Sequence, residues 1–94
     1  MVIYLTGLIT GDSNYREKFA KHAAKLEEAR HTVLTPAMLP ETLTPAARTR
    51  IRMAMVDAAD EVVFLEDWKE SKGAKLEHDY CTNTGKPRRY PFGR

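Results

Sequence analysis

The fold is decided by residues 61–77. They read Glu61-Val62-Val63-Phe64-Leu65, then Glu66-Asp67-Trp68-Lys69-Glu70, then Ser71-Lys72-Gly73-Ala74-Lys75-Leu76-Glu77. The first part is the most continuous apolar run of the chain, which predicts a buried strand. The last part opens a helix that we expect to run from Gly73 to about Thr84, with Gly85 as its C-cap. A buried strand that leads through a loop into a helix is the repeating unit of a parallel α/β sheet.

The same alternation of strand and helix extends to both ends of the chain. Further strands are expected at Val2–Thr6, at His31–Thr35 and within Lys86–Phe92. Amphipathic helices are expected at Asn14–Ala29 and Pro45–Ala59, where apolar residues recur every three or four positions. This order predicts an α/β fold with a parallel sheet of about four strands and helices on both faces.

Local signals mark the ends and the apolar faces of the two earlier helices. Asp12 or Ser13 can cap the first helix, and Thr44 is a good N-cap for the second, with Pro45 at its first position. The apolar stripe of the first helix consists of Tyr15, Phe19, Ala23, Leu26 and Ala29. The stripe of the second consists of Ala47, Ile51, Met55 and Ala58. Each stripe is expected to form one face of its helix.

Length and composition limit the classes of function. The 94 residues carry a net charge of +2 and a single cysteine, so we expect one domain over residues 1–94 without an internal disulfide. No apolar run is long enough to span a bilayer, and the first residues lack the features of a signal peptide, which together favour the cytoplasm. The basic cluster Lys86–Arg89 is interpreted as a solvated chain end, with a nucleic-acid patch as the less favoured alternative.

Metal and thiol chemistry are not indicated by the sequence. His22, His31 and His78 fall in different expected elements, and no Cys-x-x-Cys or His-x-x-x-His pair is present. Cys81 lies within the last helix and is interpreted as a buried thiol rather than a nucleophile. We therefore expect neither a metal nor a cofactor.

Three loops reach the carboxyl edge of the expected sheet: Gly7–Asp12, Pro36–Pro45 and Glu66–Lys72. Ligands of such sheets bind outside this edge, at the point where the strand order reverses. The helix that begins at Gly73 presents free backbone N–H groups there, and Gly73 lets a ligand approach the backbone closely. With the Ser71 hydroxyl beside it, this helix start is suited to a phosphate or a carboxylate. The alternative is that Ser71 only caps the helix.

Two further side chains are candidates for this pocket. Glu77 lies about one turn inside the helix and is placed to face Tyr4 on the first strand, where a tyrosine can orient a carboxylate. The alternative for Glu77 is a solvated helix glutamate. Trp68 is either a lid over the core or a stacking surface for the base of a ligand. Gly7 opens a glycine-bounded loop whose spacing differs from that of the dinucleotide fingerprint G-x-G-x-x-G.

Three segments together resemble the nucleoside 2-deoxyribosyltransferase superfamily. They are Ile3-Tyr4-Leu5-Thr6-Gly7, then Ala59-Asp60-Glu61-Val62-Val63-Phe64-Leu65, and then Trp68-Lys69-Glu70-Ser71-Lys72-Gly73-Ala74 followed by Glu77. The strongest likeness is to the small phage and bacterial branch of the superfamily, with its pattern D-W-x-x-S-x-G-A-x-x-E. The resemblance extends from Met1 to about Pro87.

This resemblance implies a single Rossmann-like, flavodoxin-like domain that cleaves or exchanges the N-glycosidic bond of a deoxynucleoside or its 5′-monophosphate. It implies that Glu77 is the catalytic nucleophile, which attacks the anomeric carbon, and that Tyr4 is the catalytic residue that positions it. It also implies a phosphorylated ligand, because Ser71 offers a hydroxyl where relatives that act on free nucleosides carry a carboxylate. The expected substrate-binding residues are Gly7, Arg52, Trp68, Ser71 and Gly73.

The chain departs from the superfamily pattern at the general acid. Relatives usually carry an acidic residue about two helical turns before the Ala59-Asp60 pair, and here that position holds Arg52, which could instead grip a phosphate. Two functions therefore stay open: an N-glycosidic hydrolase or deoxyribosyltransferase, and a non-catalytic protein that binds a nucleotide or a nucleotide-derived signal. The short chain also favours a homodimer or higher homo-oligomer, with the Pro45–Ala59 helix as a candidate interface.

Overall fold

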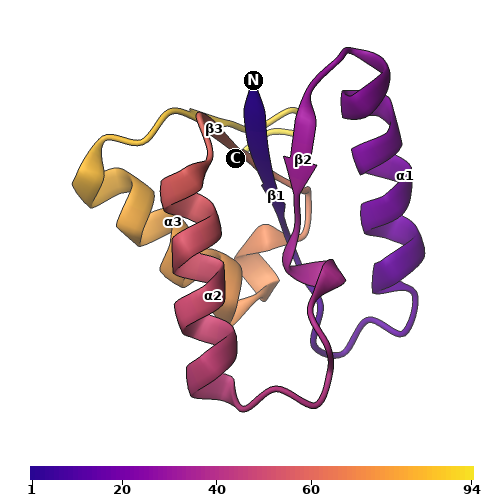
Figure 1. Cartoon of the computed structure of the whole chain (residues 1–94), viewed down its shortest axis with the longest axis vertical. Helices are drawn as coiled ribbons and strands as arrows, with labels where there is room; N and C mark the ends of the chain where they lie inside the picture. Colours follow the sequence, from indigo (N-terminus) through magenta and orange to yellow (C-terminus); the bar gives the residue numbers. More distant parts are fainter.

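A single sheet of four parallel strands forms the centre of the molecule (Figure 1). The computed structural model describes residues 1–94. The strands are β1 (Val2–Thr6), β2 (Thr32–Leu34), β3 (Glu61–Phe64) and β4 (Arg88–Arg89). The helices are α1 (Tyr15–Glu28), α2 (Pro45–Ala58) and α3 (Lys72–Thr84). Two short 3-10 helices, Pro36–Met38 and Trp68–Glu70, lie in loops that the sequence left irregular.

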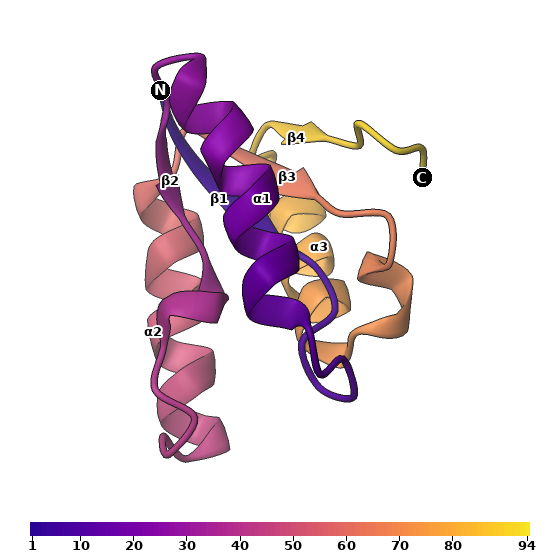
Figure 2. The ribbon, with the colours of Figure 1, turned by 90° about the vertical axis from the view of Figure 1, so that its right-hand side faces the viewer.

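The first strand lies inside the sheet, whose order is β2-β1-β3-β4. Tyr4 is aligned with Leu34 on β2 and with Val62 on β3. Helix α1 covers one face of the sheet, and α2 and α3 cover the other, so the molecule has three layers (Figures 1 and 2). This arrangement confirms the predicted α/β fold with a parallel sheet and helices on both faces.

The alternation of side chains along β1 divides the core in two. Ile3 and Leu5 point toward α1, where Phe19 is buried between them and β3. Tyr4 points to the opposite face, where it packs with residues of α2 and α3. Thr6 shares that face with Tyr4 because successive residues of a strand alternate. The hydroxyl groups of Tyr4 and Thr6 therefore lie on the side of the sheet that α3 covers.

Most predicted helix ends are confirmed. The Thr44 Oγ1 accepts a hydrogen bond from the backbone N–H of Ala47 at 3.2 Å, and Gly85 ends α3 with φ of 75°. Such a left-handed conformation costs glycine little, so it suits a helix C-cap. The predicted cap of α1 is wrong, because Asn14 is the N-cap and its side chain makes no capping bond. Asp12 instead accepts a hydrogen bond from the backbone N–H of Asn14 at 2.9 Å.

The predicted apolar stripe of α2 is also wrong. The buried residues of this helix are Arg52 and Val56, whereas Ile51 is 36% exposed. The inward face is thus displaced from the stripe by one residue, and it contains a charged side chain. A buried arginine is tolerated only with a partner for its charge, and that partner lies on α3. The role of α2 as a dimer interface stays a prediction.

Candidate functional site

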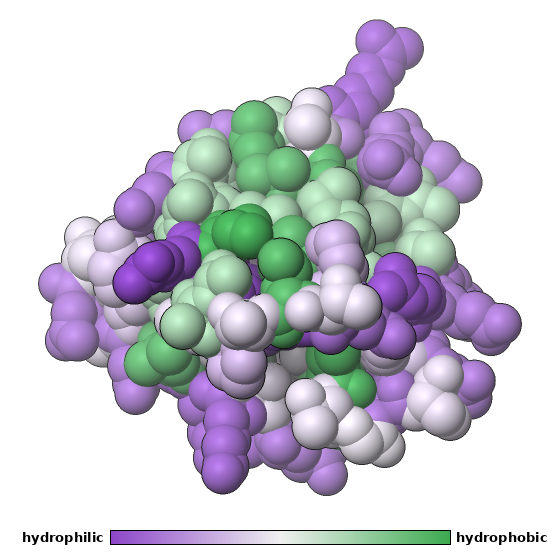
Figure 3. Space-filling view, turned by 60° about the horizontal axis from the view of Figure 1, so that its bottom comes forward, coloured by the Kyte–Doolittle hydropathy of each residue, from purple (hydrophilic) through white to green (hydrophobic).

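A cleft of about 880 Å³ opens at the carboxyl edge of the sheet. It lies between the loops that follow β1 and β3, the two neighbouring strands at which the strand order reverses, as expected for a ligand site of such a sheet. Its lining residues are Leu8, Ile9, Thr10, Gly11, Asp12, Ser13, Tyr15, Glu41, Arg48, Arg52, Glu70, Ser71, Lys72 and Gly73. Seen from this edge, hydrophobic side chains gather in the middle of the surface and hydrophilic ones surround them (Figure 3).

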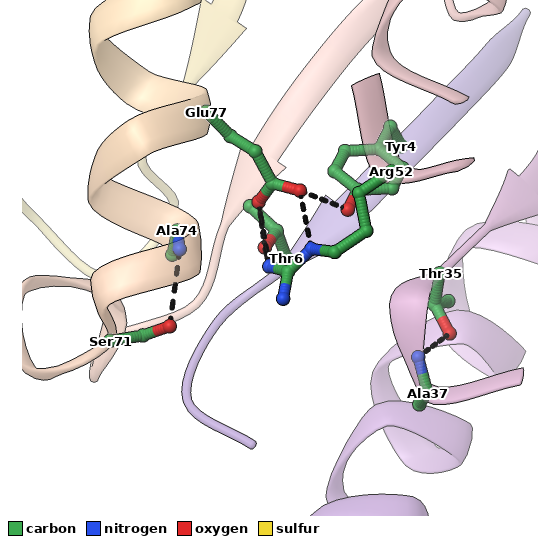
Figure 4. A network of polar contacts seen from close by, with 8 residues as sticks. All are labelled: Tyr4, Thr6, Thr35, Ala37, Arg52, Ser71, Ala74 and Glu77. Atoms are coloured by element: carbon green, nitrogen blue, oxygen red, sulfur yellow. Dashed lines mark hydrogen bonds and ion pairs between the residues drawn. The ribbon is translucent and has the colours of Figure 1, made fainter. Parts of the chain in front are cut away.

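Behind the cleft, four polar side chains form a closed network that we call the buried cluster: Tyr4, Thr6, Arg52 and Glu77 (Figure 4). Glu77 is fully buried and accepts every bond of this network except one. Its Oε2 accepts from the Tyr4 hydroxyl and from Arg52 Nε, the latter at 2.7 Å. Its Oε1 accepts from Thr6 Oγ1 at 2.7 Å and from Arg52 Nη2 at 2.9 Å. Both carboxylate oxygens are therefore fully engaged.

The charges of the buried cluster reinforce one another. Burial raises the pKa of the Tyr4 phenol well above its ordinary value, and the Glu77 carboxylate raises it further, so Tyr4 stays protonated and donates. Burial alone lowers the pKa of the Arg52 guanidinium, but its hydrogen bonds to Glu77 and its electrostatic interactions with Tyr4 and Glu77 together outweigh this and raise the pKa. The cluster is thus a neutral ion pair with one phenol and one threonine hydroxyl attached.

Arg52 separates Glu77 from the cleft. The arginine lines the cleft, whereas Glu77 contacts only a small cavity of about 40 Å³ between α2 and α3. A Cβ added to Gly73 would lie 2.5 Å from Arg52 Nη1 and 2.8 Å from its Cζ. The guanidinium therefore occupies the space beside Gly73 that the sequence analysis reserved for a ligand.

Ser71 caps α3 and also lines the cleft. Its Oγ accepts a hydrogen bond from the backbone N–H of Ala74 at 3.1 Å, so it caps α3. It also lines the cleft and is only 7% exposed. Because the cap uses the oxygen as an acceptor, the hydroxyl hydrogen stays available to a ligand. The N–H groups of Lys72 and Gly73 have no acceptor within the helix.

A second charged group, which we call the Lys18 cluster, lies at the side of the cleft toward α1. It consists of Lys18, Asp12 and Asp67. The Lys18 ammonium donates to Asp12 Oδ2 at 2.6 Å, to Asp67 Oδ2 at 2.5 Å and to the carbonyl of Leu8 at 2.9 Å. Asp67 Oδ1 in turn accepts from the N–H of Leu8 at 2.9 Å. These bonds tie the loop after β1 to the loop after β3.

The family of the chain can now be given. Residues 1–90 match the family model described as Domain of unknown function (DUF4406). The chain belongs to the DUF4406 family. Neither the curated proteins nor the solved structures give a significant match.

Two expected substrate-binding residues of this DUF4406 domain lie outside the cleft lining. A Cβ on Gly7 would lie 2.9 Å from both Asp67 Oδ1 and Leu65 Cβ, so this glycine makes room for the loop after β3. Trp68 is 7% exposed and stacks on His78 with a centroid distance of 4.3 Å. Its ring is part of the core that α3 covers, which fits the lid alternative of the sequence analysis.

The structure of the DUF4406 domain also brings in residues that the sequence analysis did not single out. Thr6 was overlooked because a threonine at the end of a strand is ordinary, and nothing local shows that it meets Glu77. Tyr15, Glu41 and Arg48 line the cleft from three separate segments. No group of three or more potential metal ligands comes together, and no helix is long and apolar enough to cross a membrane.

Proposed function

We propose that the cleft binds a phosphorylated, nucleotide-like ligand, with the phosphate at the start of α3. The observation that carries the proposal is the convergence of donors at one end of the cleft. The Ser71 hydroxyl and the backbone N–H groups of Lys72 and Gly73, which have no acceptor within the helix, belong to residues that line this end. The N-terminus of a helix also favours negative charge, so this end is suited to a phosphate.

The remainder of the cleft suits the nucleoside part of such a ligand. Leu8, Ile9 and Tyr15 provide an apolar and aromatic wall. The cleft, at about 880 Å³, lies within the common range of small-molecule sites, roughly 300–1,000 Å³. Of the three lining carboxylates, Asp12 pairs with Lys18 and Glu41 lies 3.8 Å from Arg16, whereas Glu70 forms no ion pair. Repulsion of an anionic ligand is thereby reduced at the first two.

The proposal can be tested by calorimetry with 2′-deoxynucleosides and their 5′-monophosphates. We expect each monophosphate to bind more tightly than its nucleoside. Ser71→Asp keeps an N-cap residue but places a carboxylate at the anion end, so monophosphate affinity should fall about 10-fold or more while nucleoside affinity changes little. Asn83→Asp is the matched control, because it adds a carboxylate on the exposed last turn of α3, outside the cleft lining, and should leave binding unchanged. If no compound binds, or if Ser71→Asp binds monophosphates like the wild type, the proposal is wrong.

A second candidate function is N-glycosidic cleavage or transfer with Glu77 as nucleophile. The Tyr4–Glu77 hydrogen bond supports it, because it is the pairing that the resemblance to the nucleoside 2-deoxyribosyltransferase superfamily implies. The position of Arg52 speaks against it, because a cavity of about 40 Å³ beside Glu77 has room for a water molecule but not for a sugar. Catalysis would therefore require the ion pair to open.

The two candidates are separated by following release of the free base by chromatography. A non-catalytic binding protein releases no base from any deoxynucleoside or monophosphate. An enzyme that uses Glu77 releases base from at least one of them, and Glu77→Gln abolishes the release. Equal release by the wild type and Glu77→Gln would exclude the nucleophile assignment.

A further inference from the structure

Arg52 has one edge that is fixed and one that is free. A guanidinium has five N–H donors in a rigid fork. Three of them are used: Nε and one hydrogen of Nη2 bind Glu77, and the second hydrogen of Nη2 points to Thr6 Oγ1 at 3.4 Å. The two hydrogens of Nη1 have no acceptor in the chain. Nη1 itself is not fully buried, so solvent can reach part of its surface.

The free edge belongs to the cleft. Arg52 is only 9% exposed, and it lines the cleft together with Ser71 and Gly73. In Figure 4 the nitrogen of Arg52 that carries no dashed line points away from Glu77. Nη1 can occupy this position because residue 73 is a glycine. A Cβ on Gly73 would lie 2.5 Å from Nη1 and would displace it. An N–H group without a partner, on an arginine that is nine-tenths buried, thus lies next to the start of α3.

We propose that Arg52 Nη1 is the specific anchor for the anionic group of the ligand, and that Glu77 is the positioning residue that holds it. The inference rests on the proposed function and adds to it the atom that recognises a phosphate monoester. Arginine is suited to this task because its planar fork can bind one carboxylate along one edge and another anion along the next.

The buried cluster explains how such an anchor can exist without its ligand. A nearly buried arginine with no partner would be costly in the empty protein. Glu77 removes this cost, and the Tyr4 and Thr6 hydroxyls fix the carboxylate in turn. The guanidinium is therefore already oriented when the ligand arrives, so little side-chain freedom is lost on binding. This assigns Glu77 a function without requiring it to touch the ligand.

The test uses inorganic phosphate as the simplest probe, followed by a 2′-deoxynucleoside and its 5′-monophosphate. Arg52→Lys keeps the positive charge but removes the fork. We expect it to weaken phosphate and monophosphate binding about 10-fold or more, since hydrogen bonds to charged groups are among the strongest polar contacts. Nucleoside affinity should change less than twofold. Arg50→Gln, an exposed residue of the same helix that does not line the cleft, is the control and should bind like the wild type.

Gly73→Ala tests the same anchor without changing a charge. Its methyl group would displace the guanidinium, so phosphate affinity should fall by a similar factor although alanine favours a helix more than glycine does. Circular dichroism shows whether each variant is folded. Arg52→Lys changes the arginine itself, whereas Gly73→Ala keeps the guanidinium and moves it, so a loss of phosphate binding in both folded variants supports the anchor.

The positioning role of Glu77 is tested by a double-mutant cycle. Glu77→Gln should weaken phosphate binding several-fold but leave nucleoside binding unchanged. It should add little to Arg52→Lys, because residues that act as a unit are not additive. Full additivity would overturn the positioning role, and wild-type phosphate affinity in Arg52→Lys or Gly73→Ala would overturn the anchor.

The outcomes distinguish this inference from the proposed function. If monophosphates bind the wild type and Arg52→Lys equally, the anchor is wrong and the proposed function stands. If inorganic phosphate binds in an Arg52-dependent manner but no nucleotide does, the anchor stands and the proposed function is wrong. If the wild type binds neither phosphate nor any monophosphate, both fail.

Discussion

The buried cluster and the Lys18 cluster both join a helix to the carboxyl edge of the sheet, but in different surroundings. The side chains of Arg52 and Glu77 are 10% and 0% exposed, whereas those of Lys18 and Asp12 are 20% and 24% exposed. Water can take the place of a lost partner more readily in the second cluster than in the first. We therefore expect the Arg52–Glu77 ion pair to contribute to ligand recognition and to the specificity of the fold. The ion pairs of Lys18 are expected only to hold the two loops together.

Removal of Glu77 should have the largest effect. Glu77→Leu leaves Arg52 with an uncompensated buried charge, so we expect a loss of about 3–5 kcal/mol in the free energy of unfolding, measured by urea denaturation at pH 7. The double variant Arg52→Met with Glu77→Leu removes both charges and should be more stable than Glu77→Leu alone. The double variant should lose less free energy of unfolding than Glu77→Leu and Arg52→Met lose in sum. If it loses as much, the two residues are not coupled, and the contrast between the two clusters is wrong.

Removal of Lys18 should have a smaller effect that depends on salt. Lys18→Met breaks partly exposed ion pairs, so we expect a loss of about 1 kcal/mol at low ionic strength. The loss should shrink in 1 M salt, where the screening length is about 3 Å, whereas the effect of Glu77→Leu should persist. Lys21→Met, on the exposed side of the same helix, is the control and should change stability little. If 1 M salt reduced the stability losses of Lys18→Met and Glu77→Leu equally, the two clusters would not differ in their exposure to solvent.

The smallest effect should be on the pH dependence that Asp12 contributes. The hydrogen bond from Lys18 holds the pKa of the Asp12 carboxyl below its ordinary value, and the N–H of Asn14 lowers it further. Because the folded-state pKa is lowered, this stabilisation is present above the unfolded pKa of about 3.9 and is lost as the pH falls through the lowered value. Carboxyl NMR titration should show the lowered pKa in the wild type and a shift back toward about 3.9 in Lys18→Met. An unchanged midpoint would show that Lys18 is not the cause.

Features that depend only on residues close together in the sequence could be predicted. The continuous apolar run of β3 and the proline and glycine signals around α2 and α3 carry their own structural preferences. Thr44 and Gly85 were placed correctly because caps depend on the few residues around them. The alternation of strands and helices predicted a ligand site at the carboxyl edge of the sheet, and the cleft lies there.

Features that depend on distant partners could not be predicted. The burial of Arg52 in the core of α2 could not be predicted, because only Glu77, which lies on another helix, makes it possible. Gly73 was interpreted as room for a ligand because no local pattern indicates that a side chain from α2 would fill that space. Position 52, where the resemblance implies a general acid, therefore holds a cation fixed by Glu77.

The central place of β1 also has a consequence for folding. Tyr4 and Thr6 meet Glu77 across 73 and 71 residues of sequence. Contacts between such distant residues form slowly, because a long loop must close before any of them stabilises the chain. On the ribosome, β1 emerges before β3 and α3 and cannot complete its contacts until they follow. Until α3 is made, the Arg52 guanidinium lacks the Glu77 carboxylate that balances its charge. The buried cluster and the native topology are therefore completed by the same late step, so a chain released before α3 is made has neither.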